Sequence, residues 1–302
     1  MRRNRSILSV PAGSWRMIEK AVSLPTDLVL LDLEDAIVPD LKLEARRVVI
    51  RALTELQWGD RTTAYRCNGL ETQYFYRDII DIVEAAGSAV DTIVVPKVGR
   101  AEDLIVVDTL LSGIELGLGL TPGAIKLHGQ IESARGLINV ESIASATPRL
   151  EALVFGPGDY AANIRMPMES IGVMDRWDEA YPGHRLHYPM LRMLVAARAA
   201  GLEAIDGPVA NYKDGEAHRR SCTIARSLGF DGKWCIHPDQ LATTNEIFSP
   251  TERELTWARR VIEAYEEAVA QGRGAVSIDG TMIDVASIRL AETTIEAAKR
   301  FT

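Results

Sequence analysis

The sequence contains few cysteines, no long apolar run and no excess of basic residues, and each shortage excludes a class of protein. Only three cysteines, Cys67, Cys222 and Cys235, occur among 302 residues, and their spacing is unpaired. We therefore expect reduced thiols in a cytoplasmic protein rather than a disulfide framework. No segment approaches the ~20 apolar residues of a membrane span, and the apolar stretch after Arg5 is too short for a secretory signal.

The formal net charge of −8 argues against nucleic-acid binding, although it leaves room for a local basic patch that binds an anionic ligand. Apolar residues make up 47% of the chain, which supports a compact core, and the length suits one large domain with a tail. We therefore expect a globular protein with neither nucleic acid nor a membrane as its partner.

Short β-rich runs alternate with helical patterns over the first 240 residues, which predicts repeated strand–helix units. The predicted strands are Ser6–Val10, Leu28–Leu33, Thr62–Arg66, Thr92–Pro96, Ile125–Ile131, Ala152–Phe155, Ala204–Asp206 and Lys233–Ile236. Eight units favour a closed (β/α)8 TIM barrel over an open sheet, and no glycine-rich dinucleotide motif follows the first strand. The long stretch 165–187 is expected to form a loop over the mouth of the barrel.

The end of the chain has a different pattern. Ser249 and Pro250 resemble the N-cap and first position of a helix that runs to about Gln271. A glycine-rich stretch, 272–280, then leads to a final helix. We therefore predict a barrel over residues 1–248 and a helical extension over 249–302, with a mobile lid at 272–285.

Two carboxylates follow neighbouring predicted strands, Glu132 after the fifth and Asp159 after the sixth. The carboxyl ends of barrel strands meet at one mouth, where bare like charges are costly unless a cation lies between them. Two carboxylates completed by water predict Mg²⁺. The alternatives are an ion pair of Glu132 with Arg135, and a cap by Asp159 for a helix that begins at Tyr160.

Arg66 ends the third predicted strand. Its forked guanidinium suits a carboxylate or an enolate oxygen, so we expect it to stabilise developing negative charge. An ion pair with Asp32 or Glu34 is compatible with that role. We expect Glu34 and Asp35 to orient Arg66 and the waters of the metal.

Basic residues occur at two further places. Lys97 ends the fourth strand, where acids would raise its pKa and so disfavour Schiff-base chemistry. It is expected to orient substrate or to form a salt bridge within the barrel. Arg5, Arg16 and Lys20 cluster near the first strand and its helix, as a phosphate site or as an ordinary charged surface.

Seven motifs, taken together, carry a family resemblance. They are Leu31–Ala36 (LDLEDA), Arg66–Gly69, Val95–Lys97, Ile131–Gly136, Phe155–Tyr160, Gly229–Asp239 and Phe248–Thr251. In this order they resemble the citrate lyase β-subunit-like family, the group of HpcH/HpaI aldolases and of malyl-CoA, citramalyl-CoA and β-methylmalyl-CoA lyases. The resemblance implies a TIM barrel, trimeric or hexameric, that uses Mg²⁺ to break or make a carbon–carbon bond beside a CoA thioester.

The resemblance also assigns roles to residues. It makes Glu132 and Asp159 the metal ligands and Arg66 the oxyanion-stabilising arginine. It places Arg5, Arg16 and Lys20 at the CoA phosphates. Lys97 and Gly158 are also expected to bind the substrate. Asp284 matches a lid acid that closes over a neighbouring subunit's site and handles the proton at the thioester α-carbon, although its position alone predicts a helix N-cap. The family's Gly-x-Glu-Asp motif is Gly156–Asp159 (GPGD) here, without the first acid.

The expected activity is cleavage or formation of a 3-hydroxyacyl-CoA, with a 2-oxo acid and an acyl-CoA as the other partners of the reaction. Two alternatives stay open at this point. One is a malyl-CoA thioesterase, in which water attacks the thioester. The other is a citrate lyase β-type subunit that acts on an acyl-carrier-protein thioester within a larger assembly.

Overall fold

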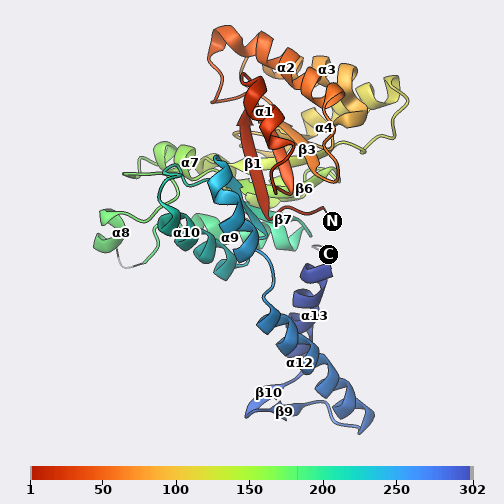
Figure 1. The fold of residues 1–302 in the computed structure, drawn as a ribbon, viewed down its shortest axis with the longest axis vertical. Helices are drawn as coiled ribbons and strands as arrows, with labels where there is room; N and C mark the ends of the chain where they lie inside the picture. The colour runs from red at the N-terminus through yellow and green to blue at the C-terminus, as the bar shows by residue number, and fades with distance from the viewer. Residues whose placement is uncertain (1, 182, 300–302) are drawn as a thin grey trace. The chain divides into compact units, whose positions relative to one another are not determined.

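Eight parallel strands close into a barrel in the computed structural model, which describes residues 2–181 and 183–299 (Figure 1). The strands follow one another in chain order, and β8 pairs with β1 to close the sheet. Their bounds are β1 Ser6–Pro11, β2 Leu28–Asp32, β3 Thr62–Arg66, β4 Thr92–Val95, β5 Lys126–Ile131, β6 Leu150–Phe155, β7 Glu203–Asp206 and β8 Gly232–Cys235. The predicted (β/α)8 barrel is confirmed, and each predicted strand is present to within two residues at either end.

Helices connect the strands and lie around the outside of the barrel (Figure 1). They are α1 Trp15–Ala21, α2 Lys42–Glu55, α3 Phe75–Ala86, α4 Ala101–Gly117, α5 Ala134–Ile138, α6 Val140–Ala144, α7 Pro157–Asn163, α8 Arg176–Ala180, α9 His187–Ala199, α10 Gly215–Leu228 and α11 Leu241–Ile247. Three 3₁₀ turns are Pro39–Leu41, Gly87–Ala89 and Pro238–Gln240. None of these helices, over the described part of the chain, is long and apolar enough to cross a membrane.

Aliphatic strand residues fill the barrel interior because a parallel sheet covered by helices is buried on both faces. Every residue of β2, β3 and β4 is buried. The inner cluster contains Ile7, Leu28, Leu30, Ala64, Val94, Ala152, Val154, Ile205 and Trp234. Cys67, Cys222 and Cys235 are buried free thiols, as predicted.

The connection between β6 and α9 is the long loop expected over the mouth. It contains α7 and the short helix α8, and Arg185 ties it together through ion pairs with Asp175 (2.8 Å) and Asp178 (3.2 Å). Ile171 of this loop lines the cavity at the barrel mouth. The loop therefore contributes a wall to that cavity.

The chain divides into two compact units, one over Asn4–Asn245 and one that begins at Glu246 and includes residues 2 and 3. The second unit contains α12 Glu252–Ala270, the antiparallel strands β9 Val276–Ile278 and β10 Thr281–Ile283, and α13 Val285–Lys299. Ser249 was the expected cap of α12, but Thr251 caps it instead, because its hydroxyl accepts the Glu254 amide (3.2 Å).

Residues 276–283, within the segment predicted to be a glycine-rich lid, form a β-hairpin. Ile278 and Ile283 are buried in one cluster with Ala258 and Val261 of α12 and Ala291 of α13. The turn of the hairpin, Asp279–Gly280, has positive φ at both positions (50° and 81°), which is the geometry that an Asp-Gly pair favours in a two-residue hairpin turn. That dipeptide between two short runs rich in β-branched residues, Val276–Ile278 and Thr281–Ile283, was the sequence signal for the hairpin.

Candidate active site

A cavity of about 400 Å³ opens at the carboxyl ends of the barrel strands. It is lined by Ser9, Pro11, Asp32, Asp35, Ala36, Arg66, Gln130, Glu132, Gly156, Pro157, Gly158, Asp159, Ile171, Pro208, Trp234 and Ile236. Six of the predicted site residues meet there: Arg66, Asp35, Glu132, Asp159, Gly158 and, behind the wall, Glu34 through its ion pair with Arg66. This is the mouth at which barrel enzymes place their reactive groups.

Glu132 lies directly after β5 and is only 2% exposed. Its Oε1 accepts the Lys97 backbone amide (2.7 Å), and its Oε2 accepts the Gln130 side-chain amide (2.6 Å). A side chain at Gly156 would place Cβ 2.4 Å from Glu132 Oε2, so glycine is required beside it. Among the described residues Glu132 forms no ion pair with Arg135, and that alternative is not what the structure shows.

Asp159 is exposed in the first turn of α7, on the neighbouring strand–helix unit. Pro157 occupies the first turn of this helix, which suits its fixed φ and missing N–H. The helix therefore begins before Tyr160, and the alternative of a cap by Asp159 is not what the structure shows, because Gly156 is the N-cap residue. The Asp159 carboxylate consequently remains available at the cavity.

The electrostatics of the cavity favour a bound cation. Four carboxylates line it (Asp32, Asp35, Glu132 and Asp159), with Arg66 as the guanidinium among them. Burial, together with the charges of Glu34 and Asp159, raises the pKa of Glu132 to about 8. A divalent cation between Glu132 and Asp159 would offset this repulsion.

The donor set fits Mg²⁺ rather than zinc. Both predicted ligands are carboxylates, and the described residues contain no group of three or more His, Cys, Asp or Glu side chains arranged to hold a metal. Mg²⁺ is bound in proteins by one or two carboxylates and keeps the remaining positions for water or substrate oxygens. Glu132 and Asp159 therefore suit a cation whose open positions face the cavity.

Arg66 is fixed by two carboxylates. The register of β2 and β3 sets Asp32 directly beside Arg66, and Asp32 accepts from Nε (2.7 Å) and Nη2 (2.6 Å). Glu34 lies 2.8 Å from Nη1. Although burial opposes the charge, Asp32 and Glu34 raise the pKa of Arg66 above its ordinary value. The expected ion pair is present, and it presents a permanently charged guanidinium at the cavity wall.

Asp35 lies farther from Arg66 than Glu34 does. Its side chain is 58% exposed and lies 3.8 Å from Arg66 and 3.7 Å from Lys97. The bidentate orienting contact to Arg66 comes from Asp32 instead. Sequence reasoning named Asp32 as an ion-pair partner but could not rank these acids, because their order depends on strand register.

Lys97 connects Glu34, which follows β2, with Glu132, which follows β5. Its Nζ donates to Glu34 and its backbone amide donates to Glu132. A φ of 54° puts this residue in the left-handed region, which is uncommon outside glycine and is found at functional sites. Although burial lowers it, the hydrogen bond that Lys97 donates to Glu34 raises the pKa of Lys97 above its ordinary value, which disfavours Schiff-base chemistry.

The structure separates the three basic residues expected at the CoA phosphates. Arg5 precedes β1, at the amino end of the barrel, and forms a bidentate ion pair with Asp27 (2.8 and 2.7 Å). That location is opposite the mouth and does not support the expected phosphate contact of Arg5, which stays a prediction. Arg16 and Lys20 are exposed on α1, which follows the carboxyl end of β1, and their phosphate contact stays a prediction.

Asp284 caps α13 in the second compact unit. Its Oδ1 accepts the backbone amides of Ala286 (2.9 Å) and Ser287 (3.2 Å). These hydrogen bonds, that of Ser287 first, lower the pKa of Asp284. The N-cap alternative is therefore present, and the proton-handling role stays a prediction.

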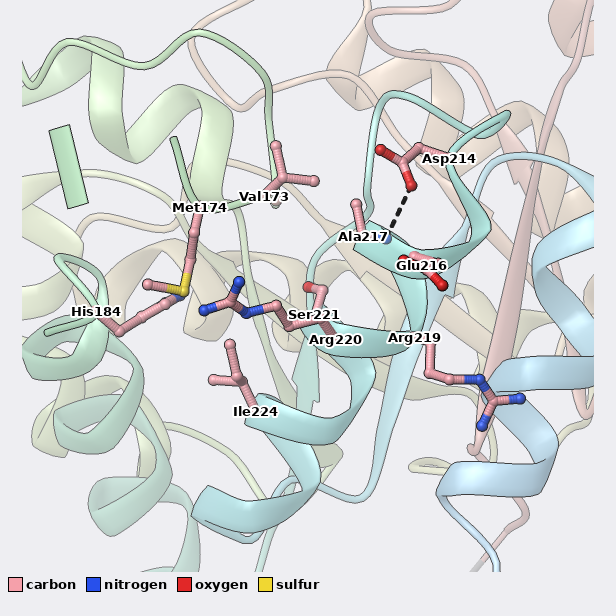
Figure 2. Close-up of a pocket in the computed structure, with 11 residues that line it drawn as sticks. Val173, Met174, His184, Asp214, Glu216, Ala217, Arg219, Arg220, Ser221 and Ile224 are labelled. Atoms are coloured by element: carbon pink, nitrogen blue, oxygen red, sulfur yellow. Dashed lines mark hydrogen bonds between the residues drawn. The ribbon is translucent and has the colours of Figure 1, made fainter. Parts of the chain in front are cut away.

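A second cavity, of about 510 Å³, lies between residues 172–174 of the long loop and the start of α10 (Figure 2). Asp214 caps α10 there by accepting the Ala217 amide (2.9 Å), and Arg220 extends toward Met174 (Figure 2). Its lining shares no described residue with the first cavity and includes none of the predicted site residues. The first cavity is therefore the candidate active site.

The chain belongs to the HpcH/HpaI aldolase/citrate lyase family, whose sequence profile matches residues 5–238. It is 38% identical to the L-malyl-CoA/beta-methylmalyl-CoA lyase of Cereibacter sphaeroides (strain ATCC 17025), over 99% of this chain and 95% of that protein. It is also 35% identical to a (3S)-malyl-CoA thioesterase of Cereibacter sphaeroides, over 98% of this chain and 94% of that protein. The family predicted from the sequence motifs is confirmed.

Solved structures show the same fold. The protein CitE from Mycobacterium tuberculosis, in complex with magnesium, acetoacetate and coenzyme A, is 27% identical and has a TM-score of 0.79 over 98% of each chain. A citrate lyase from Burkholderia xenovorans LB400 has a TM-score of 0.83, over 98% of this chain and 92% of that one, at 21% identity. At this low identity, the likeness to the Burkholderia protein shows a shared fold and nothing about function.

Proposed function

We propose that this enzyme is a Mg²⁺-dependent carbon–carbon lyase that cleaves or forms a 3-hydroxyacyl-CoA such as malyl-CoA or β-methylmalyl-CoA. The products of cleavage are a 2-oxo acid and an acyl-CoA. The observation that carries the proposal is the buried Glu132, held among like charges in a cavity that also presents Arg66. The 38% identity to the L-malyl-CoA/beta-methylmalyl-CoA lyase supports the substrate class.

Glu132 and Asp159 would hold the metal. When bound there, Mg²⁺ supplies Lewis-acid polarisation of the oxygens of the 2-oxo acid. Lys97 and Gln130 keep Glu132 oriented through hydrogen bonds to both of its oxygens. Such supporting contacts fix the direction of a ligand and exclude unproductive rotamers.

Arg66 would stabilise the negative charge that develops on the thioester carbonyl oxygen as the carbon–carbon bond breaks. A guanidinium has five N–H donors, so ion pairs with Asp32 and Glu34 do not exhaust it. Because both partners hold it in place, little reorganisation is needed when charge develops, which is the source of electrostatic catalysis.

Asp284 would return a proton to the α-carbon of the acyl-CoA, from the hairpin unit of a neighbouring subunit. Arg16 and Lys20 on α1 would contact the CoA phosphates, and Gly158 would leave room for the substrate beside Asp159. This arrangement requires a homo-oligomer, which we propose to be a trimer or hexamer. Size-exclusion chromatography with light scattering tests the oligomer.

A panel of 3-hydroxyacyl-CoA esters, incubated with and without Mg²⁺, tests the activity. A lyase releases 2-oxo acid and leaves the thioester intact, so free thiol does not accumulate. Product formation should require the metal. Equal turnover in the presence of a chelator would contradict the proposal.

The second candidate is a malyl-CoA thioesterase, favoured by the 35% identity to such an enzyme. The same assay separates the two, because a thioesterase releases free CoA and malate without any 2-oxo acid. Turnover of free CoA esters by the purified chain would also exclude a subunit that needs an acyl-carrier-protein thioester.

A further inference from the structure

One hydrogen-bond donor at the candidate site has no partner. The indole Nε1 of Trp234 is buried and forms no hydrogen bond within the described structure, and the residue lines the cavity. Only 4% of Trp234 is exposed. Buried polar groups are nearly always hydrogen-bonded, and an unpartnered one in a native structure calls for a ligand or a bound water.

The position of Trp234 is fixed on several sides. It lies on β8 in register with Ile7 of β1, and it belongs to the apolar cluster of the barrel interior. The Arg66 guanidinium lies 5.2 Å from the centre of the indole ring, and Arg66 is itself held by Asp32. Because these neighbours restrict the ring, the N–H cannot readily turn to another partner.

The chemistry of the donor identifies what it would bind. An indole N–H donates and never accepts, so it suits an anionic or carbonyl oxygen. Gln130 Oε1 is also buried at this cavity without a partner, but it is an acceptor and would repel such an oxygen. Trp234 and Arg66 line the same cavity and lie close to each other, and two such donors suit a carboxylate.

We propose that the indole N–H of Trp234 donates a hydrogen bond to a carboxylate oxygen of the bound 2-oxo acid. Trp234 is then a substrate-binding residue for the acid half of the reaction and has no part in binding the acyl-CoA half. This inference rests on the proposed function, since it needs a 2-oxo acid in the cavity.

The test is Trp234→Phe, which removes the N–H and keeps an aromatic ring under Arg66. Trp58→Phe is the matched control, because Trp58 is 7% exposed and its Nε1 donates to the Ala52 carbonyl (3.1 Å), away from the cavity lining. Four quantities are measured: the Kd of oxalate in the presence of Mg²⁺, the KM of glyoxylate and the KM of acyl-CoA in the condensation direction, and the melting temperature.

The expected results differ between the two variants. W234F should raise the oxalate Kd and the glyoxylate KM by about 10- to 100-fold, the range for a hydrogen bond to a charged group. Its acyl-CoA KM and melting temperature should stay close to those of the wild type. W58F should lower the melting temperature and leave all three constants unchanged.

Two outcomes overturn the inference alone. If wild type binds oxalate and W234F binds it equally well while melting lower, the N–H serves a structural water. If W234F raises the KM of glyoxylate and the KM of acyl-CoA to the same extent, the substitution has only changed the packing of the cavity. Failure of the wild type to bind oxalate with Mg²⁺ or to turn over any CoA ester would instead overturn the proposed function, and this inference with it.

Discussion

The backbone amide of Lys97 donates a hydrogen bond to Glu132 Oε1 (2.7 Å), while the side chain of the same lysine reaches Glu34. One residue thereby links the end of β5 to the acids that follow β2. Lys97 makes both contacts while its backbone is in the left-handed region, with a φ of 54°. The arrangement of the mouth thus depends on a local conformation that most residues avoid.

Replacing the two proposed metal ligands should abolish Mg²⁺-dependent turnover. For Glu132→Gln and Asp159→Asn we expect a loss of at least about 100-fold in kcat/KM, because the Lewis-acid contribution of a bound metal is worth several kcal/mol. Without metal, E132Q should melt at or above the wild-type temperature, because it removes a buried carboxylate among like charges.

Glu115→Gln is the control for that stability effect. Glu115 is also fully buried, but it pairs with Arg149 at 2.5 Å. Removing its charge leaves a buried guanidinium less well paired, so E115Q should melt lower than the wild type. Calorimetry with and without Mg²⁺ checks both variants. A fully active E132Q would remove the proposed metal site.

Arg66→Lys should keep the charge and lose the forked contact to Asp32. A lysine ammonium cannot reproduce a bidentate pair, so we expect kcat to fall by about 10²- to 10³-fold, as when one oxyanion donor is removed. Mg²⁺ affinity, measured by calorimetry, should change little, because Arg66 is not a ligand. A large loss of Mg²⁺ affinity with unchanged kcat would contradict the proposed role.

Two substitutions of Lys97 separate the effect of its backbone conformation on stability from the effect of its side-chain ion pair. Lys97→Gly and Lys97→Ala both remove the ion pair with Glu34, but only glycine adopts a φ of 54° without steric cost. We expect K97G to be more stable than K97A by about 1 kcal/mol. Urea unfolding measures the difference. Equal stability of the two variants would show that the local backbone is not strained.

Two substitutions of Asp284 distinguish capping from proton transfer. Asparagine caps helices about as well as aspartate, so Asp284→Asn should leave the stability unchanged and lower kcat for reactions that need the α-carbon proton. Asp284→Ala should lower kcat and also lower the melting temperature through loss of the cap. Wild-type turnover by D284N would leave the residue a helix cap only.

His218 should make the fold sensitive to acid. Burial lowers the pKa of His218 to about 4, below its ordinary value of 6.5, and the ring contacts the Thr244 hydroxyl at 2.9 Å. The folded protein therefore keeps this histidine neutral where the unfolded chain protonates it. Stability is complete above about pH 6.5 and falls by up to about 1.4 kcal/mol per pH unit toward pH 4. His218→Gln should flatten that slope, as measured by denaturant unfolding at each pH.

The sequence by itself determined the order of strands and helices, the closed barrel and the pairing of Glu132 with Asp159 at one mouth. These features follow from local patterns, because apolar runs and caps specify each element and parallel strands all end at the same face. The motifs around these residues were also enough to identify the family. The Asp-Gly turn of the hairpin is an equally local signal, and the lid role of this segment stays a prediction.

Only the tertiary structure decided which side chains share the cavity. The register of β2 against β3 chose Asp32 as the main partner of Arg66, and the start of β1 put Arg5 at the opposite end of the barrel. Closure of β8 on β1 brought Trp234 under Arg66. Sequence patterns cannot supply these relationships, because a side chain's direction and depth in a barrel depend on strand pairing between residues far apart in the chain.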